Sequence, residues 1–131
     1  MRIRVGIDLV DAATIAEALE AHGDRYLQRI YRDSEIADCR RGGVLDVDRL
    51  AARFAAKEAA IKALRPGDDP IPWRDIEVRC RPSGPPELLI HGLAATFAHD
   101  AGITGFALSI THEQGTAVAF VVAEARTGAD R

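Results

Sequence analysis

The segment from Leu50 to Leu64 constrains this fold most, because it is a helix without an ordinary polar face. It contains neither Gly nor Pro, and Ala fills seven of its fifteen positions, so we expect an α-helix. At about 100° per residue, alanines cover most of the helix and the larger apolar side chains share one arc, namely Leu50, Phe54, Ile61 and Leu64. A helix that is apolar all round is normally buried, which predicts a central position for this one.

Four charged residues interrupt this helix: Arg53, Lys57, Glu58 and Lys62. Unpaired charge inside a protein costs on the order of several kcal/mol, so each of them needs a partner, a metal or a ligand. Glu58 and Lys62 have the spacing of a favourable helix ion pair, whereas Arg53 and Lys57 place like charges one turn apart. The pattern leaves ordinary salt bridging and a functional site equally open. The like-charged pair favours an anionic ligand.

The composition indicates one globular unit. At 131 residues we expect a single domain over residues 1–131, and the apolar and charged fractions, 47% and 28%, are ordinary for a soluble protein. The net charge of −3, without a basic run, argues against nucleic-acid binding. The apolar run at the N-terminus is too short for a signal peptide, and no stretch approaches the length of a membrane span. Cys39 and Cys80 are isolated, which favours a reducing cytoplasmic setting.

Helices and strands follow one another with short connections. Asp46 or Asp48 is expected to cap the central helix, Pro66 to end it, and Asp11 to cap a shorter first helix. The other expected elements are strands at 3–9, 73–80, 88–90, 105–110 and 116–123, helices at 12–19, 33–39 and 93–99, and one or two amphipathic turns at 26–31. This order predicts an α+β fold with an antiparallel sheet packed around a long central helix. Neither glycine-rich nucleotide motif, G-x-G-x-x-G or the P-loop, is present.

Polar residues stand in apolar surroundings at three places: Asp8 at the end of the first strand, Glu58 with Lys62 in the central helix, and the segment from Ser109 to His112. Two carboxylates without clustered Cys or His suit a hard cation such as Mg²⁺. Magnesium commonly serves a phosphate substrate, whose charge would be matched by Arg53, Lys57, Lys62 and His112. Taken singly, Asp8 is more often a strand-end cap, His112 a solvated loop histidine and Ser109 a hydrogen-bonding strand residue.

Together these segments resemble the phosphopantetheinyl transferases. The segments are Gly6-Ile7-Asp8, the helix motif from Arg53 to Ala59 followed by Lys62, and Ser109-Ile110-Thr111-His112. The chain length and the motif order are similar to the holo-acyl-carrier-protein synthase branch, as are the run from Trp73 to Val78 and the Gly84-x-Pro86 turn. The helix motif is specific, whereas the first and last motifs would be weak alone.

The resemblance implies a 4'-phosphopantetheinyl transferase fold and a magnesium-dependent reaction in fatty-acid or polyketide-type biosynthesis. Such enzymes move the phosphopantetheine arm of coenzyme A to a serine of an acyl carrier protein and release adenosine 3',5'-bisphosphate. By motif position, Asp8 and Glu58 would bind the metal and Lys62 the pyrophosphate, and Glu58 or a metal-bound water would be the base. The nucleotide part would be held by Arg53, Lys57, Ser109 and His112, together with the turn from Gly84 to Pro86. The branch commonly forms trimers, so a homotrimer is expected.

The chain departs from that branch where the acidic carrier usually docks. Between Val5 and Gly23 there is no Arg or Lys, although Arg25, Arg29 and Arg32 follow and could take over docking; a merely solvated face is an equal reading of these three. Proline also stands in the Gly84–Pro86 turn where a basic residue often sits. Two rival functions are a non-catalytic coenzyme A-binding module and a structural domain with an internal ion-pair network. A pure binder has little use for the Asp8–Glu58 pair, which favours the transferase.

Overall fold

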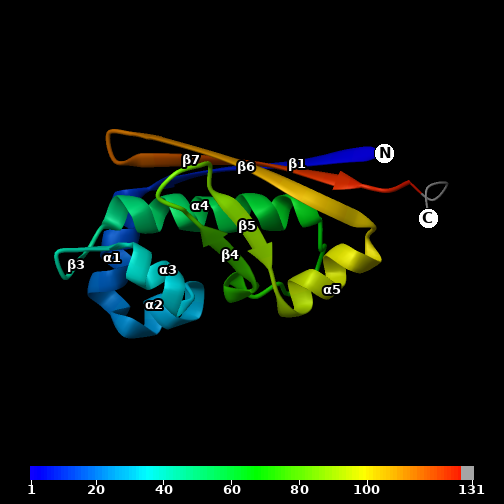
Figure 1. Cartoon of the computed structure of the whole chain (residues 1–131). Helices are drawn as coiled ribbons and strands as arrows, with labels where there is room; N and C mark the ends of the chain where they lie inside the picture. The colour runs from blue at the N-terminus through cyan, green and yellow to red at the C-terminus, as the bar shows by residue number, and fades with distance from the viewer. Residues whose placement is uncertain (128–131) are drawn as a thin grey trace.

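A three-stranded antiparallel sheet packs on the central helix α4 in the computed structural model, which describes residues 1–127. The sheet has the order β1-β7-β6, and two short hairpins, β2-β3 and β4-β5, complete the strands. Figure 1 shows α4 running along the three long strands, with α1, α2 and α3 at one end and α5 at the other. The elements are β1 Arg2–Asp11, α1 Ala12–His22, α2 Asp24–Ile30, α3 Asp33–Asp38, β2 Arg40–Arg41, β3 Val44–Leu45, α4 Val47–Leu64, η1 Trp73–Asp75, β4 Ile76–Arg79, β5 Glu87–Ile90, α5 Gly92–Asp100, β6 Ile103–Glu113 and β7 Thr116–Ala125.

The predicted α+β class with an antiparallel sheet around a long central helix is confirmed. Helix α4 begins at the cap Asp46, whose side chain accepts hydrogen bonds from the backbone N–H groups of Asp48 and Arg49. It ends at Arg65, which adopts the left-handed conformation with φ 55° and donates its N–H to the Ile61 carbonyl. Of the two expected caps, Asp46 is therefore the one that the fold uses.

Small side chains let the sheet approach α4 very closely. The alanines of α4 are buried and meet an inner sheet face that is also rich in alanine, including Ala117, Ala119 and Ala123 of β7. At Gly6 of β1, a Cβ atom would lie 1.9 Å from the Ala59 carbonyl oxygen of α4. Only glycine fits there, so Gly6 sets the distance at which β1, and with it Asp8, lies from the central helix.

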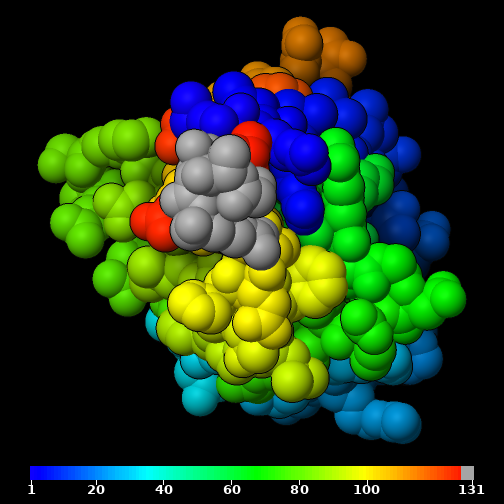
Figure 2. Space-filling model, turned by 90° about the vertical axis from the view of Figure 1, so that its right-hand side faces the viewer, coloured from blue at the N-terminus to red at the C-terminus, as the bar shows by residue number. Residues whose placement is uncertain are grey.

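The outer face of the sheet is apolar and exposed. Along β1 the residues Gly6, Asp8 and Val10 turn toward α4, so the alternating residues face outward, where they are 51–62% exposed: Ile3, Val5, Ile7 and Leu9. Phe120 of β7 lies opposite Ile7 and is 41% exposed. Figure 2 shows the N-terminal residues (blue) on the surface above α5 (yellow). A contiguous apolar face of this kind marks an interaction surface in a soluble protein.

Three local details differ from the sequence prediction. Residues 73–75 form a turn of 3₁₀ helix, and the strand starts at Ile76. Asp11 makes no side-chain cap bond to α1 and instead accepts a hydrogen bond from the Thr116 hydroxyl. The first strand does not end near Asp8 but continues to Asp11. The amphipathic turns expected at 26–31 and the short helix expected at 33–39 are present as α2 and α3. Within residues 1–127, no helix is both long and apolar enough to cross a membrane.

Candidate functional site

Asp8, Glu58 and Lys62 lie together at the contact between β1 and α4. Asp8 faces α4 because it alternates with the outward-facing Ile7 and Leu9, and its Oδ1 lies 3.1 Å from Lys62 Nζ. The Lys62 ammonium also donates to the Ile7 carbonyl at 2.9 Å. Asp8 and Glu58 line one pocket, together with Thr14 of α1. The predicted acid pair and its lysine are therefore brought to one place by the fold.

Glu58 does not form the local ion pair that its spacing with Lys62 allowed. Lys62 turns to Asp8, and Glu58 Oε1 accepts a hydrogen bond of 3.0 Å from the indole N–H of Trp73. Within residues 1–127, Asp8 Oδ2 and Glu58 Oε2 have no hydrogen-bond partner. The carboxylate pair thus keeps one oxygen on each side chain available to a ligand.

The donor set fits magnesium better than a transition metal. No group of three or more His, Cys, Asp or Glu side chains in the described chain gathers to hold a metal by itself. Magnesium is commonly bound by one or two carboxylates, with water and substrate phosphate completing its coordination. Asp8 and Glu58 line a shared pocket and each keeps an oxygen without a partner, which matches that mode, and Lys62 beside Asp8 adds charge for a phosphate.

A second cluster lies on the other side of α4. Arg53, His112 and Pro86 line a pocket together with Cys80 and Ile110. The Arg53 side chain is only 4% exposed, and its Nη2 lies 3.6 Å from Asp38 Oδ2. Its Nε is buried without a hydrogen-bond partner. A buried unpaired donor beside an open pocket is the group that an incoming anion would satisfy.

Lys57 faces neither pocket. Its side chain is fully buried, and its ammonium donates to Glu35 Oε1 at 2.7 Å, to the Trp73 carbonyl at 3.2 Å and to the Ile76 carbonyl. Burial lowers the pKa of Lys57, and the Glu35 carboxylate opposes that shift. Lys57 thus joins α3, η1 and β4 to α4. Its expected contact with the nucleotide stays a prediction that this geometry does not favour.

Glu35 is not among the residues that the sequence predicted for the site. A lysine inside an all-apolar helix needs a partner, but the sequence pattern does not indicate that this partner is Glu35, which precedes Lys57 by 22 residues. Besides Lys57, the Glu35 carboxylate accepts the backbone N–H groups of Arg32 and Val78, so all of its partners are internal. Burying a paired, fully hydrogen-bonded carboxylate is the condition under which such a charge is tolerated.

Ser109 lies on the opposite face of the sheet from His112. In the β6–β7 register Ser109 is opposite the outward-facing Phe120, whereas His112 is opposite the buried Ala117. The structure therefore does not bring Ser109 and His112 into one pocket within a single chain. Gly84 has φ 116° and open space around it, and of the predicted turn residues only Pro86 lines the pocket of Arg53.

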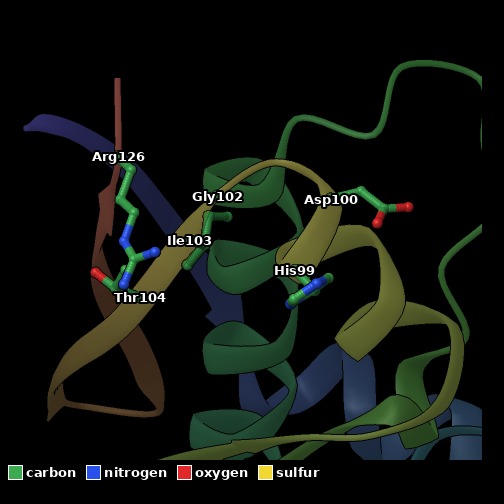
Figure 3. Close-up of a pocket in the computed structure, with 6 residues that line it drawn as sticks. All are labelled: His99, Asp100, Gly102, Ile103, Thr104 and Arg126. Carbon is green, nitrogen blue, oxygen red and sulfur yellow. The ribbon is translucent and has the colours of Figure 1, made fainter. Parts of the chain in front are cut away.

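The two clusters are separated by the width of the sheet. Asp8 is on β1 and His112 on β6, which are the two edge strands, about 10 Å apart across β7. Arg53 and Glu58 point to different sides of α4, and each lines a different pocket. A further polar hollow, lined by His99, Asp100, Thr104 and Arg126, lies beyond the far end of the sheet (Figure 3). That hollow contains none of the predicted site residues.

A family model described as the 4'-phosphopantetheinyl transferase superfamily matches residues 4–119. The chain belongs to this superfamily. A holo-[acyl-carrier-protein] synthase of Solibacter usitatus is 41% identical over 125 residues, covering 95% of this chain and 99% of the relative. The same-named protein of Carboxydothermus hydrogenoformans is 45% identical over 119 residues, covering 89% and 94%.

Solved structures of this transferase family agree with the fold. The holo-[acyl-carrier-protein] synthase of Neisseria meningitidis has a TM-score of 0.80 at 31% identity, covering 92% of this chain and 97% of its own. The Helicobacter pylori enzyme, solved in complex with coenzyme A, has a TM-score of 0.78 at 29% identity, covering 92% and 99%. The predicted membership of the holo-acyl-carrier-protein synthase branch is confirmed, and the chain is an enzyme of that branch.

Proposed function

We propose that the chain transfers the 4'-phosphopantetheine arm of coenzyme A to a serine of an apo acyl carrier protein, using Mg²⁺. One observation carries the proposal: Asp8, Glu58 and Lys62 lie in one place, with a free oxygen on each carboxylate. The relatives named as holo-[acyl-carrier-protein] synthases, one of them crystallised with coenzyme A, support the same substrates.

In the reaction, the carrier serine oxygen attacks the phosphorus next to the pantetheine arm and forms a new P–O bond. The P–O bond to the second phosphate of the pyrophosphate breaks, and adenosine 3',5'-bisphosphate leaves with the electron pair. Asp8 and Glu58 would hold magnesium, which when bound supplies positive charge against the pyrophosphate. Lys62, half-exposed at 54%, would exchange its contact with Asp8 for the leaving phosphate. Glu58 would receive the serine proton.

The pocket of Arg53 and His112 is our candidate for the nucleotide end of coenzyme A. Its buried Arg53 Nε is a donor without a partner, and His112 and the nearby Arg49 add donors for phosphate oxygens. Pro86 belongs to the same wall, so the Gly84–Pro86 turn would lie beside the nucleotide. This assignment keeps Arg53, His112 and the turn in their expected roles.

Cys80 provides a direct test of that pocket, because it lines it and is exposed. We expect iodoacetamide to label Cys80 and adenosine 3',5'-bisphosphate to slow the labelling by about tenfold or more at saturation. Cys39 is the internal control: burial raises the pKa of its thiol to about 11, so it should stay unlabelled in the folded protein. Labelling rates follow from peptide mass spectrometry. A Cys80 rate that the nucleotide leaves unchanged would place the nucleotide elsewhere.

A homotrimer would unite the two clusters. The exposed apolar face of β1 and β7 is the surface that such an assembly would bury, and the acid pair and the nucleotide pocket face different sides of one chain. In a trimer, the acid pair of one subunit would meet the nucleotide pocket of the next. Ser109 lies on the outer face, so its hydroxyl would serve a neighbouring subunit rather than its own pocket. The subunits would meet through this outer face of the sheet and not by pairing along β7, because β7 is the central strand and both of its edges are already hydrogen-bonded.

Val5→Lys should convert the trimer to monomers, because it places a charge in the middle of the apolar face. Leu93→Lys is the matched control, since Leu93 is similarly exposed, at 60%, but belongs to α5. Sedimentation at micromolar concentration would show trimers for the wild-type chain and for Leu93→Lys, and monomers for Val5→Lys. Monomeric wild-type protein would contradict the assembly.

Arg29 is the best-placed of the three candidate docking cations. Its guanidinium is exposed and lies 5.7 Å from the centre of the Trp73 ring, and Trp73 in turn contacts Glu58. Arg25 is exposed on the same helix, α2. Arg32 is committed internally, because its Nε donates to the Arg74 carbonyl at 2.6 Å. An acidic carrier that docks on α2 would therefore bring its serine beside the acid pair.

Arg29→Glu should raise the KM for the apo carrier by about tenfold and make it less salt-dependent, with the KM for coenzyme A unchanged. The reason is that like charges would meet where the acidic carrier arrives. Arg126→Glu is the control, since it changes the net charge of the protein by the same amount but lies at the far end of the sheet. Equal effects of the two substitutions on the carrier KM would remove α2 as the docking helix.

The rival non-catalytic module would also bind coenzyme A but would not release product. Chromatographic detection of adenosine 3',5'-bisphosphate, formed only when coenzyme A, Mg²⁺ and an apo carrier are all present, separates the two functions. The acid pair favours turnover, because a binder has no need of it. A cytoplasmic setting fits the two free cysteines, and service in fatty-acid or polyketide-type biosynthesis follows from the carrier substrate.

A further inference from the structure

Trp73 holds Glu58 from outside the central helix. Its indole N–H donates to Glu58 Oε1 at 3.0 Å, and the residue itself lies on η1, between α4 and β4. Trp73 is half-buried and is the only tryptophan of the chain. A glutamate side chain has several rotatable bonds, so one hydrogen bond to one oxygen restricts where the other oxygen points.

Trp73 is itself fixed at three points. Its ring packs on Phe54 of α4, with ring centres 6.2 Å apart, and the guanidinium of Arg29 covers it. Its carbonyl accepts a hydrogen bond of 3.2 Å from Lys57, whose ammonium is locked by Glu35. Phe54, Lys57 and Glu58 all belong to about one turn of α4. The same helix turn therefore anchors the tryptophan and presents the carboxylate that the tryptophan orients.

The buried Lys57–Glu35 pair helps to fix the position of Trp73. A lysine that reached the nucleotide would leave the buried Glu35 carboxylate without its counter-charge and would give up the contact with the Trp73 carbonyl. As placed, Lys57 fixes the backbone of η1 relative to α4, and the indole N–H meets Glu58 as a consequence. Removing a group that hydrogen-bonds to a metal ligand commonly lowers metal affinity or activity by about 10- to 100-fold.

We propose that Trp73 is the positioning residue of Glu58: its N–H occupies Oε1, so that Oε2 is directed to the metal and the reacting serine, and Lys57 fixes Trp73 in turn. The proposal rests on the proposed transferase function, but it concerns the orientation of one carboxylate and can be measured apart from turnover. It also places Trp73 between Arg29, our candidate docking cation, and the acid pair.

The test replaces only the N–H. Because Trp73 is the sole tryptophan, growth with benzothienylalanine replaces it alone by an isosteric ring in which sulfur stands for the N–H. Trp73→Phe is a second variant that keeps an aromatic ring. Mn²⁺ binding to each full-length protein, with adenosine 3',5'-bisphosphate present, is measured from the free-ion signal in electron paramagnetic resonance. Turnover with coenzyme A and an apo carrier is measured in parallel.

We expect the benzothienyl protein to bind Mn²⁺ about tenfold more weakly and its kcat to fall about tenfold, with the KM for coenzyme A changed by less than about twofold. In a Glu58→Ala background the same replacement should cause no further loss of Mn²⁺ affinity, since the carboxylate it orients is gone. Unchanged Mn²⁺ affinity and kcat would overturn the proposal, as would an equal loss in the Glu58→Ala background. Mn²⁺ binding that needs Trp73, in a protein without any transfer activity, would refute the proposed function and leave this inference standing.

Discussion

Glu58→Gln is expected to lower the turnover number for phosphopantetheine transfer by on the order of 100-fold or more, because the amide would replace the charged carboxylate that we propose as a metal ligand at the reacting phosphate. The amide oxygen can still accept the Trp73 N–H, so the surrounding contacts are preserved. Steady-state release of adenosine 3',5'-bisphosphate measures the effect. Protection of Cys80 by this nucleotide should stay as in the wild-type protein, since Cys80 lies in the other cluster.

A matched change far from the site separates charge loss from catalysis. Asp100→Asn likewise converts a carboxylate to an amide, but Asp100 is exposed and lies in the hollow at the end of α5 (Figure 3), so this change should leave turnover unchanged. If Glu58→Gln turned over at the wild-type rate, the acid pair could not be the catalytic centre. That result would favour the coenzyme A-binding module or the structural ion-pair network.

Gly6→Ala is expected to lower the free energy of unfolding by about 3 kcal/mol, the upper part of the usual range for overpacking. The added Cβ would lie 1.9 Å from the Ala59 carbonyl oxygen and 3.0 Å from the Ala63 nitrogen, and both are backbone atoms of α4 that cannot rotate away. Strand and helix would have to separate, which would also move Asp8 away from Lys62. Urea unfolding followed by circular dichroism measures the change.

Gly105→Ala is the control for this prediction, because no heavy atom lies within 4 Å of its Cβ position and its φ is not in the left-handed region. Its free energy of unfolding should equal or slightly exceed that of the wild type, because replacing a glycine lowers the conformational entropy of the unfolded chain. Equal stability of Gly6→Ala and Gly105→Ala would show that β1 and α4 are not in the close contact described.

The fold was predictable where periodicity was strong. The alanine-rich helix and the alternation of the strands required no knowledge of partners, and both predictions are confirmed. The direction in which β1 faces was not predictable. Its large apolar residues Ile3, Val5, Ile7 and Leu9 look like the buried set, yet the smaller Gly6 and the charged Asp8 face the core, because only glycine admits the backbone of α4. Alternation identifies two faces of a strand but not which one meets the helix.

The sequence predicted which residues belong to the site better than it predicted how they are arranged in space. Asp8, Glu58 and Lys62 meet as expected, because the first strand packs on the central helix, although Asp8 lies within that strand and not at its end. The placement of Lys57 and of Ser109 could not be predicted from the sequence pattern. Lys57 is paired with Glu35 of α3, a contact between distant segments, and Ser109 lies on the outer face because of the β6–β7 register. Neither pairing has a signal in a single sequence.

The measurement that tests the central claim most directly is the intact mass of an apo acyl carrier protein after incubation with this chain, coenzyme A and Mg²⁺. We predict that the carrier gains the mass of one phosphopantetheine group, and that a carrier whose acceptor serine is replaced by alanine gains nothing. Chelation of Mg²⁺ should also prevent the gain. Unmodified carriers of every type tried, with a chain that is folded and binds adenosine 3',5'-bisphosphate, would contradict the transferase.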